Sequence, residues 1–180
     1  MGHIGAEVTL DNPAFIHDSA LIYGRVHIGP GASVWPHVVM RSELHEIRIG
    51  ARTNVQDFVM IHVGLTTPTI VGENCSITHH STLHGCEIGD LCLIGINATI
   101  MDGVKIGENS IVAGHSILTE NSEFPANSVI AGVPGKVVAT RDNSRANLIN
   151  ANFYHRNGEN YAQGKERFTK EDQESIRVPK

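Results

Sequence analysis

The sequence lacks the features that mark membrane and secreted proteins. No apolar run approaches the roughly 20 residues that a bilayer-spanning helix needs, so we expect no membrane partner. The first residues, MGHIGAEVTL, lack the basic stretch and apolar run of a signal peptide. The 180 residues contain only 3 cysteines, too few for a disulfide framework. We therefore expect a protein of the reducing cytoplasm.

Basic charge and aromatic rings are also scarce. The 14 lysines and arginines are outnumbered by 19 aspartates and glutamates, giving a formal net charge of −5. No nucleic-acid partner is expected, because such proteins usually carry a basic patch. Aromatic residues make up 5%, whereas glycine, with 18 residues, exceeds its usual share of about 7%. Many glycines and few rings indicate a thin, regular core.

A repeat of six residues dominates the sequence. From Ile88 an aliphatic residue or Phe opens each unit, and a small residue usually stands four places later. Neither the helical period of 3.6 nor strand alternation explains a period of six, and a β-sandwich would not keep it over this length. Three short strands joined by turns close one triangular coil. The repeat therefore predicts an all-β fold, a parallel β-helix whose coils lie about 4.8 Å apart.

Three breaks in the period still allow the faces of the prism to be counted. Segments 40–49 and 61–71 exceed one unit by three and four residues, and segment 83–88 is one residue short. If each break is a distorted corner, glycine follows the opening residue of one face on five successive coils, at positions 29, 50, 72, 89 and 107. Shifting the count at any break would scatter this column, so the column supports the count.

The repeat ends after Gly135. We expect the β-helix to occupy residues 1–140, and a C-terminal α-helix and tail to occupy residues 141–180. The helix is predicted from about 143 to 168, with an apolar side that packs along the prism or against a neighbouring chain. The segment TKEDQESIRVPK is predicted to be a mobile tail. The apolar side consists of Ala146, Ile149, Phe153 and Tyr161.

The coil count brings distant histidines together. His62 and His84 fall in one outward-facing column, about 4.8 Å apart, where two imidazoles can share a metal ion at about 2.0–2.1 Å. His79 lies above Asp57 on a different face, with Gln56 beside it. Three prisms side by side would bring all three histidines to one ion. The pattern therefore predicts a closed ring, a C3 homotrimer.

Structural roles remain open for the charged residues near these columns. Arg41 with Glu43 and Asp57 could form a salt bridge across the interface between chains. His45 and His80 lie near enough to the predicted site to stay open as candidates, whereas the other histidines are interpreted as solvated.

The three cysteines are interpreted mainly as packing residues. Cys75 and Cys92 occupy the small-residue corner position of their units. Cys86 stands beside His84 in a shortened unit, so a metal or redox role is kept as an alternative for it.

The same segments carry a recognisable pattern. It comprises Arg41-Ser42-Glu43, the stretch from Ile49 to Asp57 with Asn-Val-Gln-Asp at its end, Ile61-His62-Val63, His79 with His84-Gly85-Cys86, Ile94–Ala98, Ile100–Gly103 and Gly132–Lys136. Over roughly residues 12 to 140 this pattern resembles the gamma-class carbonic anhydrases. Many acyltransferases share the hexapeptide part, whereas the three histidines with the Asn-x-Gln-Asp segment are far more specific.

The resemblance implies a left-handed β-helix trimer with a metal at each subunit interface. The ligands would be His62 and His84 of one chain and His79 of its neighbour, with water in the fourth position. Such a metal lowers the pKa of its water to near neutral and gives a hydroxide that attacks CO₂ to form bicarbonate. Zinc is the default ion, with Fe²⁺ or Co²⁺ as alternatives.

The resemblance also implies catalytic roles around the metal, and the sequence departs from the family pattern at two places. Gln56 would orient the hydroxide, while Arg41 and Asp57 would fix the interface and hold the metal ligands; Glu43 stands where many relatives carry Asp. Fully active members have an acidic loop that exports protons, whereas segment 64–69 is short and has no carboxylate. The residue after Glu43 is likewise leucine rather than a second acid. His45, or buffer, could take over proton export.

Two other classes of function compete with CO₂ hydration. A hexapeptide acyltransferase would hold an acyl-CoA donor between prisms and use a histidine base, but it would leave the three histidines unexplained. A thioesterase using the same metal hydroxide, or a non-catalytic trimeric accessory protein of CoA-linked metabolism, is the other alternative.

Overall fold

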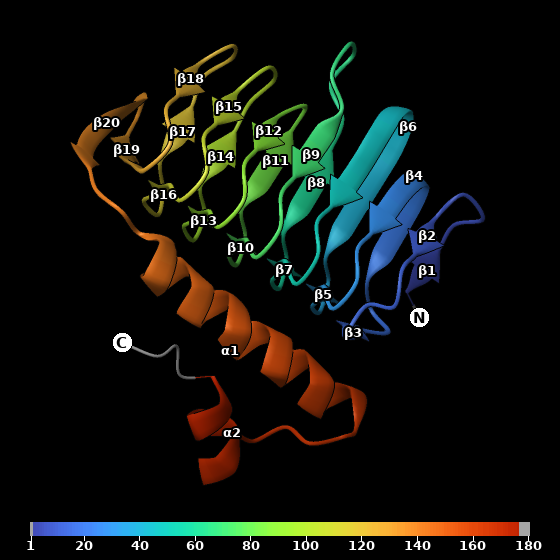
Figure 1. Cartoon of the computed structure of the whole chain (residues 1–180). Helices are drawn as coiled ribbons and strands as arrows, with labels where there is room; N and C mark the ends of the chain where they lie inside the picture. The colour runs from blue at the N-terminus through green and yellow to red at the C-terminus, as the bar shows by residue number, and fades with distance from the viewer. Residues whose placement is uncertain (1, 177–180) are drawn as a thin grey trace.

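The computed structural model describes residues 2–176 as a triangular prism with one long helix along its side (Figure 1). Short strands recur every few residues and stack coil upon coil, so the parallel β-helix predicted from the repeat is confirmed. The strands are β1 (His3–Ile4), β2 (Thr9–Leu10), β3 (Phe15–Ile16), β4 (Leu21–Ile28), β5 (Ser33–Val34), β6 (Val39–Ile49), β7 (Asn54–Val55), β8 (Met60–His62), β9 (Thr69–Val71), β10 (Ser76–Ile77), β11 (Thr82–His84), β12 (Glu87–Ile88), β13 (Leu93–Ile94), β14 (Thr99–Ile100), β15 (Lys105–Ile106), β16 (Ile111–Val112), β17 (Ile117–Leu118), β18 (Glu123–Phe124), β19 (Ser128–Gly132) and β20 (Gly135–Thr140).

Two sheets form the three faces of the prism. A 12-stranded sheet covers two faces, because β6 is long enough to pair with β8 on one face and with β9 on the next. An 8-stranded sheet from β3 to β20 forms the third face. Successive coils pair in parallel, whereas β20 runs antiparallel to β19 and closes the C-terminal end.

The strand register confirms the count of faces across all three breaks in the repeat. Arg41 pairs with His62, and His62 with His84. On the third face Val55 pairs with Ile77, which sets His79 one coil above Asp57. The extra residues of the longer breaks lie within β6 and in the loop between β8 and β9, outside the stacked positions. Pairs of residues far apart in the sequence therefore become neighbours on adjacent coils.

Aliphatic side chains from most of the strands fill the interior of the prism. Met40, Ile61, Leu83 and Ile100 stand one above another with no exposed surface. Burying each such side chain contributes about 1.5–3 kcal/mol. The small fifth residues are buried at the corners as expected, among them Cys92, Ala98, Ser110 and Ser128.

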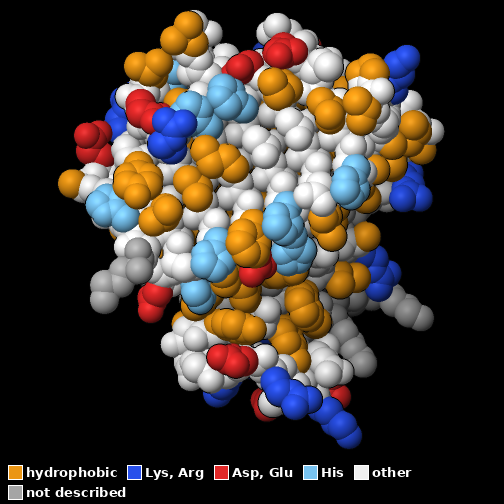
Figure 2. All heavy atoms as spheres, turned by 180° about the vertical axis from the view of Figure 1, so that it is seen from behind, with side chains coloured by type: hydrophobic (Ala, Val, Ile, Leu, Met, Phe, Trp, Pro, Cys, Tyr) orange, Lys and Arg blue, Asp and Glu red, His pale blue; other side chains and the backbone are white. Residues whose placement is uncertain are grey.

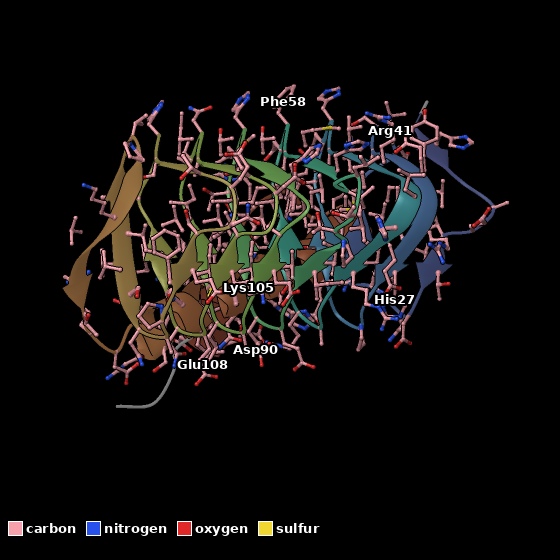
Figure 3. The ribbon with its side chains drawn as sticks, turned by 90° about the horizontal axis from the view of Figure 1, so that it is seen from above. His27, Arg41, Phe58, Asp90, Lys105 and Glu108 are labelled. Atoms are coloured by element: carbon pink, nitrogen blue, oxygen red, sulfur yellow. The ribbon has the colours of Figure 1, made fainter. Side chains whose placement is uncertain are left out.

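Left-handed backbone conformations turn the chain at the corners. Half of the non-glycine residues with positive φ in residues 2–176 are asparagines, the side chain that tolerates this region best. Phe58 is an exception, with φ of 61°. Its ring lies between those of His37 and His80, with centroids 4.9 Å apart on each side. Phe58 and Arg41 lie along one long edge of the prism, opposite Asp90 and Glu108 (Figure 3).

The long helix, α1 (Ser144–Ala162), packs on the 8-stranded sheet, but not through the predicted face. Ile149 and Phe153 are 38% and 36% exposed, so of the two predicted roles they do not pack along the prism, and packing against a neighbouring chain stays a prediction for them. The corner under the helix presents backbone carbonyl oxygens, which need hydrogen-bond donors. Polar and small residues therefore face the sheet, namely Asn143, Asn147, Ala151 and Gly158.

The chain after α1 differs from the predicted tail. A second helix, α2 (Lys170–Ser175), starts at a capping box in which Thr169 and Asp172 bond each other's backbone N–H groups. Arg156 of α1 donates to the Asp172 carboxylate at 2.8 Å. The prediction of a mobile tail was therefore wrong for residues 169–176, and residues 177–180 lie outside the described part.

Neither helix within residues 2–176 has the length and apolar character needed to cross a bilayer.

Candidate metal centre

Two imidazoles lie next to each other on adjacent coils, with their ring planes tilted by 53°. His62 ends β8 and His84 ends β11, and the parallel register pairs them directly. His62 Nδ1 lies 2.9 Å from His84 Nε2, and the ring centroids are 4.9 Å apart. Both side chains are half-buried, with 21% and 34% of their surface exposed. The pair that the six-residue period predicts therefore exists, with one ring nitrogen of each directed at the other.

A carboxylate holds the other nitrogen of each ring. His84 Nδ1 lies 2.8 Å from Asp102 Oδ1, and His62 Nε2 lies 2.9 Å from Glu43 Oε2. An ionised carboxylate only accepts hydrogen bonds, so these outer nitrogens carry the ring protons. The inner nitrogens, His62 Nδ1 and His84 Nε2, are then left with lone pairs.

The donor set fits a transition-metal ion. Two lone pairs 2.9 Å apart repel unless a proton or a metal cation stands between them. Two nitrogens that bind one tetrahedral zinc at about 2.0–2.1 Å lie about 3.3 Å apart, close to the separation observed here. Carboxylates on the outer nitrogens are the usual partners of metal-binding histidines, because they fix the tautomer and raise the basicity of the ligand.

Glu43 also ties the histidine pair to Arg41. The guanidinium of Arg41 forms an ion pair with the carboxylate that accepts from His62. Burial raises the pKa of Glu43, but hydrogen bonds from His62 and Arg41 outweigh it and lower that pKa below its usual value. Glu43 is therefore ionised at neutral pH and suited to hold the ring of His62.

The third predicted ligand lies on another face of the prism. His79 Nδ1 is 3.0 Å from Asp57 Oδ2, and its side chain is 37% exposed. Within residues 2–176 no three His, Cys, Asp or Glu side chains converge so that they could hold a metal. A three-histidine site on this chain therefore needs a second chain.

Gln56 stands next to Asp57 and is almost fully buried. Its side chain is 1% exposed, and its Nε2 donates to Asn54 Oδ1 at 2.9 Å. The structure thus places the predicted residues in two groups. Arg41, Glu43, His62 and His84 form one, and Gln56, Asp57 and His79 form the other.

Histidines gather between apolar side chains on the back of the molecule (Figure 2). His80 stacks on Phe58 through its ring, and its backbone N–H donates to the Asp57 carbonyl oxygen at 3.1 Å. His45 Nε2 lies 3.1 Å from the carbonyl oxygen of Leu65, which places it against the short loop 64–69. His45 thus remains a candidate for proton export, and the structure gives His80 a packing role.

The cysteines are buried free thiols. Burial raises the pKa of Cys86 to about 12, so its thiol stays protonated at neutral pH. Because the thiolate is the form that binds metals and reacts, this favours the packing role of Cys86. Cys75 and Cys92 stand one coil apart in the corner column and are fully buried.

Comparison with known proteins gives the family of the chain. Residues 85–120 match a family model described as bacterial transferase hexapeptide (six repeats). A protein of Methanocaldococcus jannaschii named "Probable carbonic anhydrase" is 42% identical over 123 residues, which are 68% of this chain and 77% of that protein. Gamma carbonic anhydrase 1, mitochondrial, of Arabidopsis thaliana is 37% identical over 133 residues, which are 71% of this chain. The match spans about half, 48%, of the Arabidopsis protein's length.

The chain belongs to the gamma-class carbonic anhydrase-like family of hexapeptide-repeat proteins. The family also includes the carnitine operon protein CaiE of Escherichia coli, which is 39% identical over 69% of this chain and 64% of its own length.

Solved structures share the gamma-class fold under other names. A Bacillus cereus protein named as a candidate acetyltransferase superposes with a TM-score of 0.84 at 29% identity, over 88% of this chain and 93% of its own. A hexapeptide transferase family protein of Anaplasma phagocytophilum gives a TM-score of 0.76 at 29% identity, over 87% of this chain and 92% of its own. The fold is thus common to proteins named for different activities, so the function has to be argued from the site.

Asp102 is the site residue that sequence reasoning on this gamma-class chain missed. Its segment belongs to the family pattern, but its contact with His84 joins side chains of adjacent coils that lie 18 residues apart in the sequence. Thr67 Oγ1 donates to the same carboxylate oxygen at 3.4 Å. A Cβ on Gly64 or Gly85 would stand 2.2 Å from Asp102 Oδ1, so both glycines make room for it. A glycine directly after His84 was the available signal.

Proposed function

We propose that the protein is a metal-dependent carbonic anhydrase that hydrates CO₂ reversibly at the interfaces of a homotrimer. His62 and His84 of one chain and His79 of the next hold the ion, with zinc as the default and Fe²⁺ or Co²⁺ as alternatives. The observation that carries the proposal is the pair of inner imidazole nitrogens 2.9 Å apart, each on a ring anchored by a carboxylate.

A divalent ion in such a site supplies an acidified water as nucleophile at neutral pH. The residues of the chain hold and orient the reactants around it. Glu43 and Asp102 fix the tautomers of His62 and His84, and Asp57 does the same for His79. Gln56 orients the nucleophile through its amide, and Arg41 holds the Glu43 carboxylate in place through an ion pair.

The residues around the proposed site include few groups that could carry the released proton to solvent. Loop 64–69 carries no carboxylate, and its tip residue Leu65 is 81% exposed. His45 lies against this loop through its contact with the Leu65 carbonyl. Each hydration releases one proton, so turnover at low buffer depends on how fast that proton reaches solvent. We therefore expect a slow enzyme whose rate rises with buffer concentration.

The test combines metal analysis with CO₂ hydration by stopped flow at several buffer concentrations. Purified protein should contain about one transition metal per chain, and the hydration rate should rise with buffer and fall by at least about 100-fold in His84→Ala. His115→Ala, which alters a corner histidine beyond the site, is the matched control and should keep the wild-type rate. A wild-type protein that retains no metal after reconstitution, or hydrates CO₂ no faster than buffer, contradicts the proposal.

Hydrolysis of a thioester by the same centre is a second candidate, favoured by a cavity beside the histidine pair. About 480 Å³ lie between Glu7, Tyr23, Arg25, Arg41 and Glu43, far more than CO₂ needs. Another cavity, of about 980 Å³, lies between the first coil and the end of α1 and shares no residue with the site, so it gives acyl transfer at this site no comparable support. Acyl-CoA hydrolysis by a protein that fails to hydrate CO₂ would favour this candidate.

A further inference from the structure

A buried chain of hydrogen bonds connects Gln56 to the long helix. Gln56 Nε2 donates to Asn54 Oδ1, Asn54 Nδ2 donates to Ser76 Oγ, and Ser76 Oγ donates to Asn150 Oδ1, each at 2.9 Å. Gln56, Asn54 and Ser76 are each 1% exposed. Asn150 belongs to α1, whereas the other three residues lie on or directly after strands β7 and β10 of the 8-stranded sheet.

The chain has one consistent direction. An amide nitrogen only donates and an amide oxygen only accepts, while a hydroxyl gives one proton. Because Ser76 gives its proton to Asn150, its oxygen is left to accept from Asn54 Nδ2. The second Asn54 proton goes to the carbonyl of Cys75 at 3.1 Å, so Asn54 Oδ1 is left facing Gln56. Gln56 must then present its nitrogen to Asn54 and keep its oxygen for other partners.

We infer that Asn54, Ser76 and Asn150 are positioning residues that fix the orientation of the Gln56 amide at the candidate metal centre. The inference rests on the proposed function, in which Gln56 orients the nucleophile beside the Asp57–His79 pair. It gives helix α1 a part in the site, because Asn150 accepts the Ser76 proton and, together with the Cys75 carbonyl, holds Asn54 in the orientation to which Gln56 bonds. A reversed amide would present a donor where an acceptor is needed.

A neighbouring contact on α1 provides the matched control. Asn152 accepts a hydrogen bond from Arg52 at 2.6 Å, and within residues 2–176 Arg52 makes no hydrogen bond to Gln56, Asp57 or His79. This contact docks the same stretch of helix on the same sheet without reaching Gln56. Loss of the Asn152 contact therefore reports helix docking alone.

The experiment measures the Gln56 side chain itself, in metal-free protein labelled with ¹⁵N at glutamine. The sequence has only two other glutamines, Gln163 and Gln173, and both are exposed, so the slowly exchanging amide protons belong to Gln56. Asn150→Leu and Ser76→Ala should each speed this exchange, by about ten-fold for Ser76→Ala, the factor that one buried hydrogen bond is worth. Asn150→Asp, which keeps the acceptor, and Asn152→Leu should exchange like the unaltered protein.

Steady-state kinetics of CO₂ hydration provide the second readout. Asn150→Leu should lower kcat and leave KM and metal content unchanged, and Asn150→Asp should restore kcat. Equal Gln56 exchange in Asn150→Leu and Asn150→Asp would overturn the inference, as would equal exchange in Asn152→Leu and Asn150→Leu. Absence of CO₂ hydration by the unaltered protein counts against the proposed function instead, so the two failures are distinguishable.

Discussion

Single residues decide which nitrogen of each imidazole is available to a metal. A histidine has two ring nitrogens, and the partner of one determines the state of the other. Glu43 and Asp102 accept hydrogen bonds from the outer N–H groups of His62 and His84. The lone pairs of the inner nitrogens therefore point toward each other. Two histidines on adjacent coils would not by themselves have this property, because either ring could turn its protonated nitrogen toward the other.

Asp102→Asn should therefore weaken metal binding while leaving both histidines in place. An amide can turn its NH₂ group toward His84 and favour the tautomer that puts a proton on Nε2. The loss expected for such a partner is about 10–100-fold in metal affinity. It can be measured by competition with a chelator of known zinc affinity.

The control for Asp102 is Asp90→Asn. Asp90 accepts from the backbone N–H of Glu73 at 2.8 Å, in a corner that contains none of the site residues. This variant should bind metal as tightly as the unaltered protein. Equal affinities for Asp102→Asn and Asp90→Asn would show that the carboxylate on His84 is dispensable.

At the scale of elements, the period of six predicted the strands and their register but not the helix contacts. Each unit opens with an aliphatic residue that has to point inward, so the register that stacks His84 on His62 follows from the sequence. The docking of α1 follows instead from carbonyl groups at the corners of the prism. Asn147 donates to the Leu91 carbonyl at 2.7 Å while Phe153 stays outside, a choice that helical periodicity of apolar residues does not reveal.

The short helix α2 should lose its docking on α1 in acid. The backbone N–H and hydroxyl of Thr169, followed by Arg156, lower the pKa of Asp172 far below its usual value. A carboxylate whose pKa is lowered in the folded state stabilises that state above its unfolded pKa, about 3.9, and this stabilisation is lost as the pH falls toward the folded pKa. The ¹⁵N relaxation of amides in residues 170–175 should therefore show increasing motion between about pH 4 and pH 2.

Asp172→Asn separates this effect from general acid unfolding. The amide cannot keep the ion pair with Arg156, so α2 should already be mobile at pH 6 and change little on acidification. Far-UV circular dichroism of the β-helix serves as the reference for the rest of the chain. An α2 that stays rigid in the unaltered protein down to pH 2, or in Asp172→Asn at pH 6, would contradict this account.

At the scale of the whole molecule, the three histidines of the proposed site lie on faces that one prism does not bring together. The His62–His84 pair lies on the 12-stranded sheet and His79 follows β10 of the 8-stranded sheet. In a cyclic trimer, each interface would combine the pair of one chain with His79 of the next. This division allows two inactive variants to restore each other, which a site within one chain would not.

We expect trimers that mix His79→Ala chains with His62→Ala chains to regain activity. In either mixed composition, one of the three interfaces joins an intact His62–His84 pair to an intact His79. Mixed trimers isolated through two different affinity tags should therefore bind about one metal and show about one third of the wild-type rate. The control mixes His62→Ala with His84→Ala chains. Every chain then lacks one histidine of the pair, so no interface has a complete pair and these trimers should stay inactive. Activity in the control, or none in the first mixture, would show that the three histidines do not share one ion in the way proposed.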